Sequence, residues 1–185
     1  MVADRTATET LRREHRLIVR VAASLERLIE QTTPPLDALV DCITFFRLFT
    51  DACHHRKEED HLFAALEEWG LARDSGPVAV MLEEHRAGRE LVERMSVALS
   101  AVRAGKPAGS ADFKEAARDY IRLIRQHIAK EDDALFEMAD DLIGGPACAR
   151  LCDHYEDVCR RRFEGRTVRD LERLAERIVE RAGGE

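Results

Sequence analysis

Apolar residues recur at every third or fourth position along most of this chain, which is the spacing of amphipathic helices. The inward positions of the first stretch hold a histidine among apolar side chains; they are Leu11, His15, Ile18, Ala22, Leu25 and Ile29. Thr6 and Glu9 have the T-x-x-E spacing of a capping box, which marks a helix start. The pattern therefore predicts a first helix that ends near Gln31.

Proline and glycine divide the rest of the chain into further helical stretches. The same periodicity predicts helices over residues 36–69, 78–102 and 113–138, with Ser110 as the cap of the last. Short links that contain proline or glycine separate these stretches. Four long helices joined by short links predict an all-α, up-down-up-down four-helix bundle.

Two shorter amphipathic stretches follow, over residues 148–163 and 168–182. Thr167 and Asp170 open the second one with the residue types of a helix start. An isolated amphipathic hairpin is marginal in water, so these apolar stripes must be buried, and the short links favour burial against the same chain. We predict a bundle domain over residues 1–144 and a helical hairpin over 145–185 that packs on it.

The charge balance and the cysteines narrow the class of protein. The 185 residues carry 29 basic and 36 acidic side chains, a net charge of −7, and this argues against a nucleic-acid binder. No apolar stretch is long enough for a membrane span, and the charged first thirty residues do not resemble a secretion signal.

Five cysteines without a C-x-x-C pair favour a reducing cytoplasm. Cys148, Cys152 and Cys159 share one helical stripe, and we interpret them as buried small hydrophobes rather than as a zinc or redox cluster. A thiol switch is the alternative.

The most informative feature is an internal repeat. A Glu-His-Arg triplet occurs at residues 14–16 and again at 84–86, and the pattern H-x-x-K-E-acid-x-x-L-F begins at His54 and again at His127. The matching histidines are 70 and 73 residues apart. The chain is therefore predicted to be a duplicated helical hairpin.

The repeated residues carry chemistry that an apolar core normally excludes, because buried His and Glu must be paired or bound to something. His54 and Glu58 are spaced i, i+4 on one helical face, as are His127 and Glu131. The candidate metal ligands are His15, His54, Glu58, His85, His127 and Glu131. This set of nitrogen and oxygen donors without thiolates suits iron, manganese or zinc, and two carboxylates can bridge two ions. We therefore predict a dinuclear centre.

These motifs resemble those of the hemerythrin-like HHE cation-binding domains, and the resemblance covers roughly residues 8–143. It implies a four-helix bundle with two iron ions, bridged by oxo or hydroxo, held by the six residues just named. It also implies a small diatomic ligand or peroxide and a role in oxygen carriage, sensing, or redox and nitric oxide chemistry. An electron donor or a regulatory protein would be the partner.

Two features depart from the oxygen carriers of that family. Carriers have a second histidine one turn from the one on the third helix, where this chain has Met81 and Arg89. Both ligand helices also have H-x-x-x-E, without the longer H-x-x-x-x-D spacing. We therefore expect a symmetric centre with two imidazoles per iron, which reacts with oxygen or peroxide to the di-ferric state and favours sensing or redox chemistry over carriage.

Further polar residues lie near the motifs. His61 follows Glu58 by three positions and is a candidate fifth imidazole, whereas His55 is expected in solvent or behind the ligands. Tyr120 is expected in the core, where it either packs or donates a hydrogen bond to the centre. Glu14 and Glu84 are more often part of a solvated face than partners of the ligands.

Three alternatives remain open at this stage. The domain could be a regulatory or interaction module in which the metal reports iron or oxygen status. It could also be a metal-free bundle of His–Glu pairs, although six polar groups would then have to satisfy one another. A zinc hydrolase lacks a distinct general base. The sequence leaves open whether the protein is an enzyme, which metal it carries and its oligomeric state.

Overall fold

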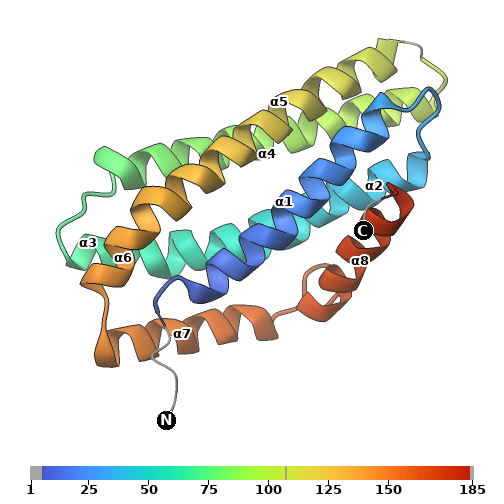
Figure 1. The fold of residues 1–185 in the computed structure, drawn as a ribbon. Helices are drawn as coiled ribbons and strands as arrows, with labels where there is room; N and C mark the ends of the chain where they lie inside the picture. The colour runs from blue at the N-terminus through green and yellow to red at the C-terminus, as the bar shows by residue number, and fades with distance from the viewer. Residues whose placement is uncertain (1–5, 107, 184–185) are drawn as a thin grey trace.

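The computed structural model describes residues 6–106 and 108–183, and it is helical throughout (Figure 1). An isolated bridge between Phe163 and Arg166 is the nearest approach to a strand among the described residues. The prediction of an all-helical chain is confirmed. No helix in the described ranges is both long and apolar enough to cross a membrane.

Four long helical runs lie side by side (Figure 1). The first is α1 (Glu9–Glu30), and the third is α4 (Gly76–Arg103). The second run joins α2 (Leu36–Phe45), η1 (Phe46–His55), η2 (Glu58–Leu62) and α3 (Phe63–Glu68). The fourth run joins α5 (Ala108–Lys130), η3 (Glu131–Leu135) and α6 (Phe136–Leu142).

The segments η1, η2 and η3 are wide π-helical turns: η1 ends at His55 and η2 begins at Glu58, within the first H-x-x-x-E motif, and η3 begins at Glu131, the last residue of the second. A π-turn closes i→i+5 hydrogen bonds, so it rotates less per residue than an α-helix and brings sequence neighbours closer to one face. Such turns are frequent at functional sites. The sequence periodicity, read at 3.6 residues per turn, does not reveal them.

Two apolar clusters make up the core, and a polar layer separates them. One cluster contains Ile18, Cys53 and Ile124, and the other contains Leu11, Leu62 and Leu135. Along each of the four runs the repeated His and Glu residues stand between a member of one cluster and a member of the other. Packing on both sides therefore holds this polar layer at one level of the fold.

The helix starts agree only in part with the sequence predictions. The capping box at Thr6–Glu9 is wrong: Thr8 precedes α1, and its amide and hydroxyl instead bond the Asp140 carboxylate of α6 at 3.0 and 2.7 Å. The cap at Ser110 is also wrong, because α5 has already begun at Ala108. The start at Thr167 is confirmed, where Thr167 and Asp170 form a reciprocal capping box.

The chain ends in α7 (Gly145–Arg160) and α8 (Val168–Arg181). The two helices follow one another along the side of the four runs and do not fold back on each other as the expected hairpin would (Figure 1). Helix α7 packs beside η2, while α8 packs beside α1 and α2. Leu171, Leu174 and Ile178 of α8 belong to the same buried cluster as the core of α1.

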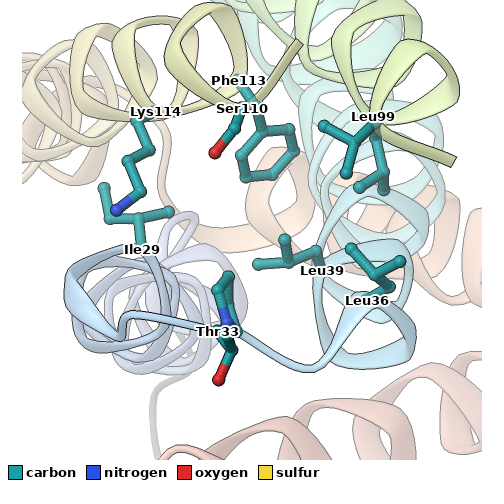
Figure 2. Close-up of a pocket in the computed structure, with 10 residues that line it drawn as sticks. Ile29, Thr33, Leu36, Leu39, Leu99, Ser110, Phe113 and Lys114 are labelled. Atoms are coloured by element: carbon teal, nitrogen blue, oxygen red, sulfur yellow. The ribbon is translucent and has the colours of Figure 1, made fainter. Parts of the chain in front are cut away.

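An apolar pocket of about 240 Å³ lies near the end of α1. Figure 2 shows Leu39, Leu99 and Phe113 around it, with residues from α1, α2, α4 and α5. Among the described residues that line it, Lys114 is the one charged side chain, and none is a histidine, cysteine or acid. This pocket therefore offers no set of ligands for a metal.

Candidate metal centre

The structure brings the six predicted ligands together in the polar layer. Glu131 Oε2 lies 3.2 Å from His15 Nε2 and 3.3 Å from His127 Nε2. Glu58 Oε1 lies 3.3 Å from His54 Nε2, and its Oε2 lies 3.3 Å from His85 Nε2. Each carboxylate thus stands between imidazoles of two different helices, and every imidazole turns its Nε2 to the centre.

His55 joins them, contrary to the sequence expectation. Its side chain is buried, and its ring stacks on that of His85 with centroids 3.8 Å apart. Neither of its ring nitrogens has a hydrogen-bond partner among the described residues. The π-turn explains this, because it lets His55 share the inner face with its neighbour His54.

The ligand atoms fall into two groups, and within each group they lie within 4.8 Å of one another. One group is His55, Glu58, His85 and His127; the other is His15, His54, Glu58 and Glu131. Ile128 stands in the second repeat where the first has His55. The expected symmetry of two imidazoles on each side is therefore wrong: three face one side of the centre and two face the other.

Two other candidates lie away from these groups. The ring of His61 stacks on that of His154 of α7, 4.9 Å between centroids, and the structure does not bring it to the buried histidines. Tyr120 is buried against Phe46, with ring centroids 4.6 Å apart, and burial raises the pKa of its phenol. A neutral phenol keeps its proton as a hydrogen-bond donor.

Each of the four repeat-matched histidines has a carboxylate at its other ring nitrogen, Nδ1. We call these four acids the outer carboxylates. The pairs are Asp132 with His15 at 2.9 Å, Glu14 with His54 at 3.0 Å, Glu59 with His85 at 2.8 Å, and Glu84 with His127 at 3.1 Å. A proton held on Nδ1 by a carboxylate leaves the Nε2 lone pair free for a metal.

The pairing with the outer carboxylates explains why the repeat also contains the glutamates that precede His15 and His85. Glu14 precedes His15 in sequence but bonds His54, and Glu84 precedes His85 but bonds His127. The expectation of a solvated face for these two acids is wrong, since Glu14 is buried and both hold imidazoles. Their recurrence beside the ligands was the signal that could have identified them.

The repeated lysines provide a matched test of burial. Lys57 pairs with Glu14 where both side chains are buried, whereas Lys130 pairs with Glu84 where the lysine is 45% exposed. Breaking a buried ion pair costs about 3–5 kcal/mol, and an exposed pair contributes about 1 kcal/mol or less. We expect Lys57→Met to lower the unfolding free energy of the metal-free protein by the larger amount in urea titrations, and Lys130→Met by the smaller. Equal losses would contradict this reading of the two pairs.

The buried carboxylates of the centre have the charge and the free oxygen atoms that a bound cation requires. Glu58 and Glu131 are fully buried, and none of their four carboxylate oxygens has a hydrogen-bond partner in the described structure. Buried carboxylates in such surroundings require a positive charge beside them. Burial opposes charge on His15, yet the Asp132 and Glu131 carboxylates raise its pKa to about 10. Burial, followed by His85 and His127, lowers the pKa of His55 and keeps that ring neutral.

A sequence model described as the hemerythrin HHE cation binding domain matches residues 6–139. The chain belongs to the hemerythrin HHE family. This hemerythrin HHE chain is also similar to uncharacterized proteins of Mycobacterium bovis and of two strains of Mycobacterium tuberculosis, each 29% identical over 170 residues. Those matches cover 85% of this chain but 63% of each relative. No solved structure shows a significant match.

The family is a cation-binding one, and the two residue groups of this hemerythrin HHE chain could hold a metal. Beside the centre, a cavity of about 240 Å³ is lined by His55, Tyr120, Gly88 and Arg89. Arg89 bonds Asp51 at 2.6 Å and the outer carboxylate Glu59 at 2.5 Å. The cavity therefore reaches the side of the centre with three imidazoles.

Proposed function

We propose that this hemerythrin HHE chain is a hemerythrin-like four-helix bundle that binds two iron ions and, through them, binds or reacts with dioxygen, peroxide or nitric oxide in a sensing or redox role. The observation that carries the proposal is the pair of buried carboxylates without hydrogen bonds, each shared between imidazoles of different helices. Two cations between these carboxylates would neutralise them and use the inward Nε2 atoms as ligands.

The residues of the centre would have three different roles in holding the metal. Glu58 and Glu131 would bridge the ions, and the five buried imidazoles would complete the set as three on one side and two on the other. The outer carboxylates orient the rings and raise their basicity as ligands. Bound iron would supply electron transfer and a position for an exchangeable ligand.

The cavity beside His55 supports a small ligand. It is lined by Phe46 and Val92 as well as by Asp51 and Arg89 at its polar edge. Its volume of about 240 Å³ admits a diatomic molecule or peroxide but lies below the range of pockets that bury drug-sized ligands. Tyr120 lines the same cavity.

Reversible oxygen binding is the second candidate function, and His55 favours it. The sequence argument against carriage rested on a missing fifth imidazole, and the structure supplies one from an unexpected position. A centre with three imidazoles on one side and two on the other leaves its two ions unequally saturated. An electron donor or a regulatory partner would be needed for the redox role and not for this one.

Metal analysis after anaerobic loading with ferrous iron tests the proposal. We expect about two iron ions per chain and, on exposure to air or peroxide, the absorption bands of a ferric pair bridged by oxo or hydroxo. Uptake of dioxygen that is released intact under vacuum would support the second candidate. Preference for zinc or manganese in a competition for the same sites, or fewer than two ions, would contradict the di-iron proposal.

A further inference from the structure

Two cysteines from distant parts of the chain meet beside the polar layer. The sulfur atoms of Cys53 and Cys159 and a Glu14 carboxylate oxygen all lie within 4.8 Å of one another. Cys53 is on η1 and fully buried, while Cys159 is on α7 and half-buried. All five cysteines lie in the described ranges, and none is in a disulfide.

The charges around the two sulfurs favour a thiolate over a third metal site. The Lys57 ammonium already binds the Glu14 carboxylate, so a cation placed there would face a buried positive charge. A hydrogen bond from the Cys53 thiol, followed by the charge of Lys57, lowers the pKa of Cys159 to about 6 against the opposing effect of burial.

Access to the two sulfurs is unequal. A cavity of about 220 Å³ is lined by Cys159, Cys152, Tyr155 and Arg13, among others, and it does not reach Cys53. A small, uncharged oxidant can therefore enter beside Cys159, through a cavity that Arg13, Glu9 and Glu156 also line. Cys53 lies behind it and is protected from direct attack. This is the arrangement of an attacking thiolate with a resolving thiol.

We propose that Cys159 and Cys53 form a peroxide-reactive thiol pair, distinct from the metal centre, that closes to a disulfide between α7 and η1. The Cys159 thiolate attacks hydrogen peroxide or an organic hydroperoxide, the O–O bond breaks, and the leaving oxygen takes up a proton from solvent water and departs as water or an alcohol. Cys159 is then a sulfenic acid. The Cys53 sulfur displaces its hydroxyl, which takes up the Cys53 proton and leaves as water. Two thiols lose two electrons, and one peroxide gains them.

The disulfide would join the helix that carries His54 to the C-terminal part of the chain. It would also remove the sulfur partners of Lys57, whose ammonium holds the Glu14 carboxylate against His54. The three cysteines of α7 share a stripe, but the partner of Cys159 lies on another helix, which the spacing of α7 alone does not indicate.

One equivalent of hydrogen peroxide added to the metal-free full chain tests this inference. We expect two thiols to be lost per peroxide and the intact mass to fall by two hydrogens. A non-reducing tryptic digest should link the peptides 48–56 and 151–160, which carry Cys53 and Cys159. Cys152→Ser should keep this link, and it leaves Cys159 as the one cysteine in its peptide.

The substitutions separate the two roles. Cys53→Ser should leave a sulfenic acid on Cys159 that dimedone captures, whereas Cys159→Ser should slow the loss of thiols about tenfold or more, since ordinary thiols are mostly protonated at neutral pH. Cys42 lies on the same helical run as Cys53 but outside the thiol pair, so Cys42→Ser should change neither the rate of thiol loss nor the linked peptides. A link between Cys152 and Cys159, or oxidation at the same rate in Cys159→Ser, would overturn the proposal. Because the sample is metal-free, failure of the di-iron proposal does not affect the outcome.

Discussion

Glu58→Gln is expected to abolish the binding of both proposed iron ions. Glu58 is the one residue shared by both ligand groups, with Oε1 facing His54 and Oε2 facing His85. The amide keeps the volume of the side chain but loses the negative charge and one of the two acceptor oxygens. Iron per chain, measured after anaerobic loading and desalting, should fall from about two to well below one.

Glu59→Gln is the matched control, because Glu59 is the next residue and contacts one imidazole from outside. Its carboxylate bonds His85 Nδ1 at 2.8 Å and does not face the centre. Loss of such an outer partner typically lowers metal affinity by about 10–100-fold. We therefore expect two ions at saturating iron and faster loss to a chelator. Retention of one tightly held ion in Glu58→Gln, or equal metal loss in both variants, would contradict the bridging role of Glu58.

His55→Ile is expected to weaken metal binding on one side of the centre and spare the other. This change copies the second repeat, where Ile128 occupies the matching position, so it leaves each side with two imidazoles. Removal of a ligand should cost at least the roughly 10–100-fold affinity that an outer partner contributes. Titration with ferrous iron should show one ion bound as in the parent chain and one bound at least about tenfold more weakly.

The equivalent change at His61 tests whether His55 or His61 supplies the fifth imidazole. His61 stacks on His154 and lies outside both ligand groups, so His61→Ile should leave both affinities unchanged. The optical spectrum of each loaded variant provides an independent measure, since it responds to the ligands of the ions. The reverse result, with His61→Ile weakening one site and His55→Ile neutral, would contradict the three-and-two arrangement.

Local spacing was enough to predict much of this fold and of its centre. The helix bounds follow from apolar periodicity and from proline and glycine, which act within a few residues. The pairs His54–Glu58 and His127–Glu131 are fixed by i, i+4 geometry, which one helix determines alone. Duplication then indicated that His15 and His85 stand at equivalent levels, so six residues could be assigned to one centre before any contact was known.

Contacts between helices required the tertiary structure, because they depend on rotation and register that packing sets. The inward turn of His55 needs the π-helical segment η1, and the α-helical periodicity places that ring about a quarter turn away. Glu14 bonds His54 on another helix and not its neighbour His15. The meeting of Cys53 with Cys159 likewise depends on where α7 packs. The sequence by itself determined which residues share a helical face; the tertiary structure decided which faces meet, and with them the fifth imidazole, the outer carboxylates and the thiol pair.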